Sequence, residues 1–485
     1  RSTYGEAQVP GRPPEEGATL ETSIDSGVQF AVERELVAAV AARGARSGTA
    51  VLLDPWTGEV VAMASVPTFD PNRFNKYSEE ARRNRAIADA YEPGSTFKIV
   101  TGSVALDRRV VRLDEVIDTG DGTIRVADTT IAEADRHRYG GLTLGGIFEH
   151  SSNVGIIRVG LRLGSRNLFE GASGFGVGKP TGVDLPGENL GIFRPLSRWS
   201  AVSAASISMG QEVSVTALQL ARIVAVVANG GRLVWPHVVR RVIPPDGPPQ
   251  TVTTPPALRV LSAETAAALR RILVGVVERG TGTLAAIPGF TVAGKTGTAQ
   301  KAGPGGYEPG RYVSNFVGLV PAESPRLVAV VILEEPHGMY YARDVAAPLF
   351  SKIVSQALSI LRIAPEEQRV PATVLAGSSG PFFPSGMIPA SLRQAPAPEL
   401  PSGPDGGDAI PDAAGLSARQ ALALMARRGI PARLEGSGFV VSQRPPAGTA
   451  WKPGIVMTLS LSEDAAAVSR SGRGREETLT ATPEP

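Results

Sequence analysis

The stretch GFTVAGKTGTAQ, residues 289–300, decides between two folds. Its first eight residues match the phosphate-loop pattern G-x-x-x-x-G-K-[ST], in which a helix must follow the loop and bind phosphate at its N-terminus. The residues between the two glycines, FTVA, are strand formers, and Gly303, Gly305 and Gly306 would break any helix that followed. We therefore predict a strand through Lys295–Thr298 and no nucleotide site.

Apolar, strand-like runs lie on both sides of this stretch. YVSNFVGLVP and PRLVAVVILEE follow it, while TAVLLD and EVVAMAS occur early and are joined by PWTG, which predicts a hairpin with a four-residue connection. Helical periodicity fills the residues between them, after an early helix in SGVQFAVERELVAAVAARG and before a last helix that begins near Asp344. We predict an α+β fold with a five-stranded, mainly antiparallel sheet flanked by helices.

The composition excludes several classes of function. With 49 Lys+Arg against 47 Asp+Glu, the net charge of +2 gives no support for nucleic acid binding. The chain has no cysteine and its four histidines are far apart in sequence, so we predict no metal and no cofactor. No run approaches the roughly 18 apolar residues of a membrane span. Because the chain begins at Arg1, we expect a membrane anchor upstream of it.

The composition also divides the chain. Residues 1–22 are loop-like, and residues 23–362 contain the predicted α+β domain. Residues 363–408 are a predicted linker, because 8 Pro and 6 Gly fall within 371–408. Residues 409–463 predict a small α/β domain, with Ser417 and Gln420 as a capping box, Gly429 as the helix stop, and strands in PARLEG, GFVVSQRP and IVMTLSLS. We expect the tail, 464–485, to be disordered.

Three short motifs in the larger domain suggest acyl-transfer chemistry. In YEPGSTFK, Ser95 lies at a predicted helix N-terminus and Lys98 one turn later on the same face, where its amine can act as a base if its pKa falls by about three units. Ser151 and Asn153 lie in a polar break between helices, suited to relaying a proton and orienting a peptide. Alone, each of these two motifs is better explained as a helix cap or turn.

The third motif is the Lys295–Thr298 segment itself. A lysine and two hydroxyls, those of Thr296 and Thr298, can bind a carboxylate, and Gly297 leaves room for a substrate backbone. Lys295 is also a candidate for the cation that lowers the pKa of Lys98.

Together S-x-x-K, S-x-N and K-T-G are the signature of penicillin-binding proteins and serine β-lactamases. YEPGSTFK, PTFDPNRF, SSNVG and AGKTGTAQ closely resemble the class B penicillin-binding proteins, which are monofunctional peptidoglycan D,D-transpeptidases. The C-terminal unit is similar to a single PASTA domain, a module often appended to such enzymes.

The resemblance implies a role for each motif residue. Ser95 is the expected nucleophile, Lys98 its base, and Ser151 with Lys295 the proton relay. The substrate, a stem peptide ending in D-Ala-D-Ala, would be bound by Asn153, Thr296, Gly297 and Thr298, with the backbone N–H groups of Ser95 and Thr298 as the oxyanion hole. β-Lactams would acylate the same serine.

The resemblance also implies a location and partners. We expect the extracytoplasmic face of a bacterial membrane, an acceptor amine from a second peptidoglycan strand, and other cell-wall synthesis or divisome proteins as partners. Three alternatives stay open: a D,D-carboxypeptidase or β-lactamase, a β-lactam or muropeptide sensor without turnover, and, most distant, a nucleotide hydrolase. Two departures from the family, Glu212 and the segment 342–344, are expected at the rim of the cleft.

Overall fold

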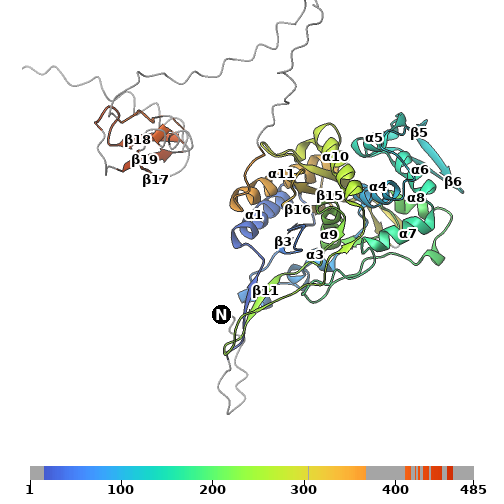
Figure 1. Cartoon of the computed structure of the whole chain (residues 1–485), viewed down its shortest axis with the longest axis horizontal. Coiled ribbons are helices and arrows are strands. Elements are labelled where there is room, and N and C mark those ends of the chain that lie inside the picture. The colour runs from blue at the N-terminus through green and yellow to red at the C-terminus, as the bar shows by residue number, and fades with distance from the viewer. Residues whose placement is uncertain are drawn as a thin grey trace, which may run out of the picture. The chain divides into compact units, whose positions relative to one another are not determined.

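The computed structural model describes residues 16–303, 305–366 and, between 410 and 462, all residues except 415, 417–420, 422–423, 426–429, 436–438 and 451–455. These residues form two compact units, one within 16–366 and one within 410–462 (Figure 1). Each unit has a hydrophobic core of its own.

A five-stranded sheet forms the centre of the larger unit, and all its neighbouring strands pair antiparallel, which confirms the predicted fold. The edge strand β14 continues through Lys295–Thr298 to Gly303, so no helix follows Lys295 and a phosphate loop is excluded here. In sheet order the strands are β14 (Ala293–Gly303), β15 (Gly306–Val320), β16 (Leu327–Glu334), β2 (Ser47–Leu53) and β3 (Val60–Val66).

The connection between β2 and β3 is longer than the predicted PWTG. It comprises residues 54–59, because the Asp54 carboxylate accepts hydrogen bonds from the backbone N–H groups of Trp56 (2.8 Å) and Thr57 (3.1 Å) and so ends β2. The predicted hairpin is confirmed, whereas its predicted length is wrong.

Two helices cover one face of the sheet, α1 (Ser26–Arg43) and α11 (Ala342–Ile360), as Figure 1 shows. The Asp25 side chain caps α1 by accepting from the backbone N–H of Val28 (2.9 Å). Helix α11 begins at Ala342, so Asp344 lies in its first turn, where a carboxylate suits the helix dipole.

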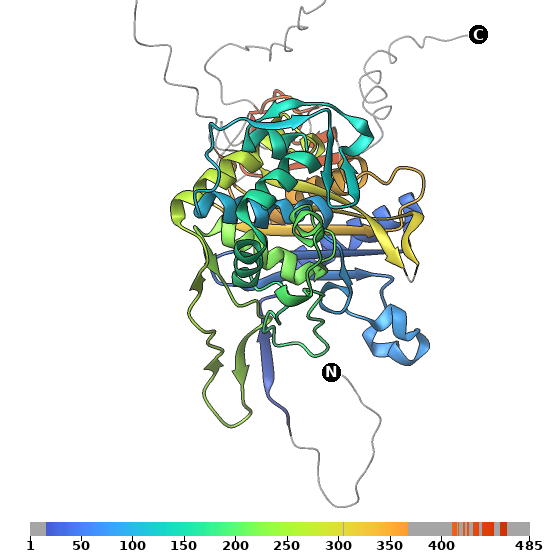
Figure 2. The ribbon, with the colours of Figure 1, turned by 90° about the vertical axis from the view of Figure 1, so that its right-hand side faces the viewer.

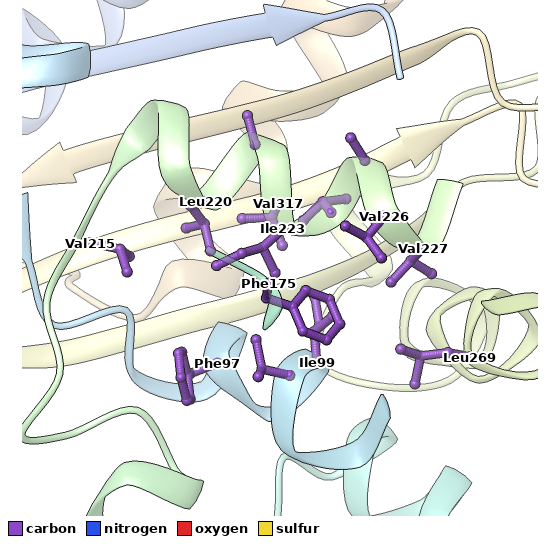
Figure 3. Packing of buried hydrophobic residues seen from close by; sticks show 14 of the residues in the cluster. Phe97, Ile99, Phe175, Val215, Leu220, Ile223, Val226, Val227, Leu269 and Val317 are labelled. Atoms are coloured by element: carbon purple, nitrogen blue, oxygen red, sulfur yellow. The ribbon is translucent and has the colours of Figure 1, made fainter. Parts of the chain in front are cut away.

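The other face is covered by α9 (Ala217–Ala228), α4 (Lys98–Asp107) and α10 (Ala263–Glu278). Every residue of α9 is buried, and Figure 3 shows its apolar side chains among Val317 of β15, Phe97 and Ile99. This core anchors the segment that carries Ser95 and Lys98. Among the described residues, no helix combines the length and hydropathy that a membrane crossing requires.

A further layer of helices and small ladders lies beyond α4 (Figure 1). It contains α5 (Leu144–Glu149), α6 (Asn153–Leu163), α7 (Ser165–Gly174) and α8 (Ser203–Ser208). Strand β5 (Ile117–Gly120) pairs with β8 (Gly140–Leu142), and β6 (Thr123–Val126) with β7 (Thr129–Ala132).

A narrow sheet of β1 (Thr19–Thr22), β11 (Val239–Ile243) and β12 (Gln250–Thr251) extends from the body of this unit (Figure 2). The remaining short elements are η1 (Pro71–Lys76), α2 (Glu79–Arg82), α3 (Arg85–Ala88), β4 (Ala90–Tyr91), η2 (Gly94–Phe97), η3 (Ala134–Arg136), η4 (Leu196–Arg198), β9 (Val215–Thr216), β10 (Arg232–Leu233), β13 (Leu258–Arg259) and η5 (Thr283–Ala285).

The smaller unit contains the three strands predicted for it. They are β17 (Ala432–Glu435), β18 (Phe439–Arg444) and β19 (Met457–Ser462), with β19 in the centre, parallel to β17 and antiparallel to β18. The predicted capping box of Ser417 and Gln420, the stop at Gly429, the tail and nearly all of the linker lie outside the described residues.

Candidate active site

Ser95 and Lys98 lie where the sequence predicts them, at the start of a helix. Ser95 is half-buried in the single turn η2, which leads directly into α4, and Lys98 is the first residue of α4 and fully buried. The turn before Ser95 requires glycine, since Gly94 has a φ of +55° and a Cβ there would lie 3.2 Å from the carbonyl oxygen of Thr298. Gly94 therefore lets the nucleophile segment pack closely against β14.

Ser151 and Asn153 lie in the predicted break between helices, α5 and α6. Ser151 has a φ of +57°, an unfavourable conformation for a residue with a side chain. Ser152 caps α6 by accepting from the backbone N–H of Gly155 (2.9 Å), and Asn153 is the first residue of that helix.

The structure brings the three motifs together at one hydroxyl. The Nζ of Lys98 lies 3.4 Å and the Nζ of Lys295 3.0 Å from the Oγ of Ser151. Lys98 also donates to the backbone oxygen of Ser151 and to the Oδ1 of Asn153 (3.0 Å). Within the described part of the chain, the Ser95 hydroxyl has no hydrogen-bond partner, so the predicted Ser95–Lys98 pair is close in sequence but not hydrogen bonded. Such contacts often tighten only with substrate.

The surroundings of the two buried lysines lower the pKa of each. Burial lowers the pKa of Lys98 to about 7, opposed by the negative charge of Glu133. Burial and repulsion from Lys98 hold the pKa of Lys295 well below its usual value. This differs from the sequence analysis, which expected the charge of Lys295 to lower the pKa of Lys98. Burial, rather than the charge of Lys295, is what lowers the pKa of Lys98.

The segment Lys295–Thr298 runs along the edge strand beside Ser95. The Oγ1 of Thr296 lies 3.2 Å from the Nζ of Lys295, and the Oγ1 of Thr298 accepts from the backbone N–H of Ala342 (2.9 Å). A Cβ at Gly297 would lie 2.6 Å from Asn315 Oδ1 and 2.7 Å from the backbone oxygen of Pro93. Glycine is therefore required by packing between β14 and the turn before Ser95, a reason additional to the room expected for a substrate.

These residues surround a cleft of about 820 Å³. Five of the eight predicted site residues line it, namely Ser95, Ser151, Asn153, Thr296 and Thr298. Lys98 and Lys295 lie beneath its surface, each 0% exposed, so they can act on the hydroxyls without contacting bulk water.

The sequence analysis missed the walls of this cleft. Tyr312 and Tyr340 stack with ring centroids 4.0 Å apart on one side, and Tyr139 stacks on His150 at 4.8 Å on another. The hydroxyl of Tyr341 donates to Asp135 (2.8 Å). These aromatic residues come from separate segments of the chain and carry no common periodic signal, so only their convergence in space reveals them.

The sequence analysis also missed Glu133, a buried carboxylate behind Ser151. It accepts hydrogen bonds from the Ser152 hydroxyl and from the backbone N–H of Asn153 (2.6 Å). Nothing in the segment TTIAEADR sets this glutamate apart from a surface residue.

The two departures at the rim have different positions. Ala342, Arg343 and Asp344 line the cleft, which confirms the expectation. Glu212 does not, because its carboxylate turns away to Arg194 and to the Ser203 hydroxyl (2.8 Å). It lines a separate cavity of about 1300 Å³ instead.

Comparison with known families gives two matches. Residues 48–355 match the penicillin binding protein transpeptidase domain, and residues 408–463 match the PASTA domain.

Curated relatives match the larger part of the chain. It is 37% identical over 355 residues to the penicillin-binding protein PbpB of Mycolicibacterium smegmatis, covering 71% of this chain and 55% of that protein. It is 39% identical over 349 residues to the peptidoglycan D,D-transpeptidase FtsI of Escherichia coli K12, covering 72% of this chain and 57% of that protein. The chain thus spans little more than half the length of these relatives.

Solved structures also match the larger part of the chain. Penicillin binding protein 3 of Mycobacterium tuberculosis in complex with aztreonam has a TM-score of 0.68 at 34% identity, covering 72% of this chain and 81% of that one. The transpeptidase domain of penicillin-binding protein 3 from Burkholderia pseudomallei has a TM-score of 0.62 at 33% identity, covering 71% and 98%. The chain belongs to the penicillin-binding protein transpeptidase family.

Proposed function

We propose that this chain is a peptidoglycan D,D-transpeptidase that forms an acyl-enzyme at Ser95. The observation that carries the proposal is the meeting of two buried lysines on the Ser151 hydroxyl, beside Ser95 and under a cleft. A relative at 39% identity is named a peptidoglycan D,D-transpeptidase, and related structures hold aztreonam or ampicillin.

Acylation begins with proton removal from Ser95. Neutral Lys98 takes the hydroxyl proton as Ser95 Oγ bonds to the carbonyl carbon of the penultimate D-Ala. The backbone N–H groups of Ser95 and Thr298 stabilise the oxyanion. The bond to the terminal D-Ala then breaks, and the proton reaches the leaving amine through Ser151.

Polar groups that remain available at the cleft can bind the substrate. The Oδ1 of Asn153 is bound to Lys98, which leaves its amide N–H₂ to donate to a peptide carbonyl. The terminal carboxylate binds at Thr296, Gly297 and Thr298, where it favours the charged form of Lys295. In the second half-reaction an amine from a neighbouring stem peptide attacks the ester and returns a proton to Ser95.

The acidic side chains around the cleft favour a transpeptidase over a β-lactamase that depends on a glutamate. The acidic side chains that line it, Asp135, Glu149 and Asp344, are engaged by Tyr341, Arg279 and Arg343, respectively. None of them is held free beside Ser95 to activate a water molecule, as a β-lactamase of the glutamate-dependent type requires.

We propose that residues 23–362 form the transpeptidase domain and that 363–408 link it to the PASTA domain at 409–463. Because the proposed substrate is peptidoglycan, we also propose a location at the extracytoplasmic face of a bacterial membrane, with an anchor upstream and divisome or other cell-wall synthesis proteins as partners.

The test uses a thioester analogue of a D-Ala-D-Ala stem peptide, with and without an acceptor amine such as D-Ala. Chromatography should show an aminolysis product that increases with amine concentration at the expense of hydrolysis. Hydrolysis alone would favour a carboxypeptidase, rapid turnover of penicillin a β-lactamase, and acylation without turnover a sensor.

A further inference from the structure

Glu133 is a buried carboxylate to which the motifs assign no role. It lies between β7 and η3 and is 4% exposed. Its two oxygens accept from the two residues that follow Ser151: one from the Ser152 hydroxyl and the other from the backbone N–H of Asn153 (2.6 Å). A carboxylate held in this way contacts the first turn of α6, where the helix dipole favours negative charge.

The turn that Glu133 binds is strained. Ser151 adopts a φ of +57°, which persists only where neighbouring contacts impose it. The Ser152 oxygen accepts from Gly155 N–H (2.9 Å), so its single proton is left to donate to Glu133. The carboxylate therefore fixes both residues that hold Ser151 in position.

Glu133 also supplies charge beside the catalytic lysines. Lys98 is faced by Ser151 and Asn153 at the start of α6, by Lys295 on β14, and by Glu133 in the segment before η3. Tyr139 is a further titratable group near Glu133, and its pKa is raised by burial and then by the charges of Glu133 and Asp135. Glu133 is thus the acidic group, among the described residues, whose charge acts on Lys98.

We propose that Glu133 is a positioning residue for acylation, one that clamps the Ser151–Asn153 turn and provides the counter-charge for Lys98. The inference rests on the proposed function. Its charge stabilises the ammonium that Lys98 becomes when it takes the Ser95 proton. The same charge raises the pKa of Lys98, so fewer Lys98 side chains are neutral at a given pH than without it.

Glu133→Gln removes the charge while keeping the size of the side chain. The rate of acylation by a fluorescent penicillin should fall on the order of 10- to 100-fold at its maximum, because the turn loses its clamp. The acid limb of the pH–rate profile should move to lower pH by about one unit, since the pKa of Lys98 falls when the carboxylate is lost. Glu133→Asp keeps the charge and should keep the limb in place while losing part of the rate.

Two controls distinguish the loss of the Glu133 charge from a structural effect of the substitution. Glu115→Gln removes a carboxylate that contacts Arg162 near the other end of α6 and should leave rate and limb unchanged. NMR titration of ¹³Cε-labelled lysine, with Lys98→Ala to assign its signal, should show a lower Lys98 pKa in Glu133→Gln.

The proposal would be overturned if neither the acid limb of the pH–rate profile nor the Lys98 titration moved in Glu133→Gln, even where the rate of acylation falls. If the wild type formed no adduct at all, the proposed function would fail, while the lysine titration would still decide the role of Glu133. Should Glu133→Gln fail to fold, a displaced limb in Glu133→Asp would also count against the proposal.

Discussion

At the scale of single residues, the proposed chemistry depends on two buried lysines whose pKa values are lowered by burial. Lys98 is 0% exposed, so its charged form is disfavoured and its pKa falls to about 7. Lys98 is therefore neutral in a large fraction of molecules at physiological pH and can accept a proton from Ser95. An exposed lysine would be almost wholly protonated there.

This predicts the pH dependence of acylation. The rate should rise with pH up to about 7, since only neutral Lys98 can act as the base, and level off above it.

Lys98→Arg keeps a cation that does not lose its proton and should lower the rate on the order of 100-fold or more. Labelling kinetics with a fluorescent penicillin between acid and alkaline pH measure both. The exposed Lys352→Arg is the matched control, and a Lys98→Arg protein that labelled at the wild-type rate would rule Lys98 out as the base.

At the scale of elements, the site depends on the contact between the edge strand β14 and the turn η2. The contact is made at two glycines, Gly94 and Gly297, each of which faces the backbone of the other segment. Phe97, the last residue of η2, is buried in the core under α9 (Figure 3). The distance between Ser95 and Thr298 is thereby set by backbone packing.

Gly297→Ala should disrupt this contact. Its Cβ would lie 2.6 Å from Asn315 and 2.7 Å from the backbone oxygen of Pro93, so β14 and η2 must separate. We expect a loss of about 1–3 kcal/mol in unfolding free energy and a fall in acylation on the order of 100-fold. Denaturant unfolding and labelling rates measure the two effects. Gly305→Ala, whose Cβ would have no atom within 4 Å, should change neither; wild-type acylation by Gly297→Ala would refute this account.

The sequence predicts elements better than it predicts their neighbours. The continuous apolar run LVAVVILE predicts β16, whereas β14 is polar and rich in glycine and is predicted from the strand formers just before it and the absence of a helix after it. Glu133, the Asp135–Tyr341 hydrogen bond and the closing of β2 by Asp54 depend on contacts or turn chemistry that no periodicity encodes. The motif residues could be predicted because family resemblance names them, whereas the partners that hold them had to be found in three dimensions.

At the scale of the molecule, each of the two units has a hydrophobic core of its own. Phe316 and Phe350 are buried in the larger unit, and Met457 and Leu459 in the smaller one. Glu366 belongs to the larger unit, and its side chain accepts from the backbone N–H of Thr291 (2.5 Å). All eight site residues lie within this unit.

Truncation after Glu366 should therefore leave the site intact. We expect a melting temperature and an acylation rate within about 2-fold of the full chain, as for a domain that folds alone. Truncation after Ile360 removes Glu366 and the partly buried Leu361 and Ile363, and should lower the melting temperature. Thermal unfolding and penicillin labelling of the two shortened chains provide the measurement. Loss of labelling in the chain ending at Glu366 would show that the C-terminal unit contributes to the site.

The central claim is that Ser95 is acylated with the help of the buried lysines, and intact-protein and peptide mass spectrometry after incubation with penicillin tests it most directly. The account predicts one long-lived penicilloyl adduct, located on the peptide that contains Ser95 and absent from Ser95→Ala. An adduct on another residue, or none in a folded wild-type chain, would contradict it.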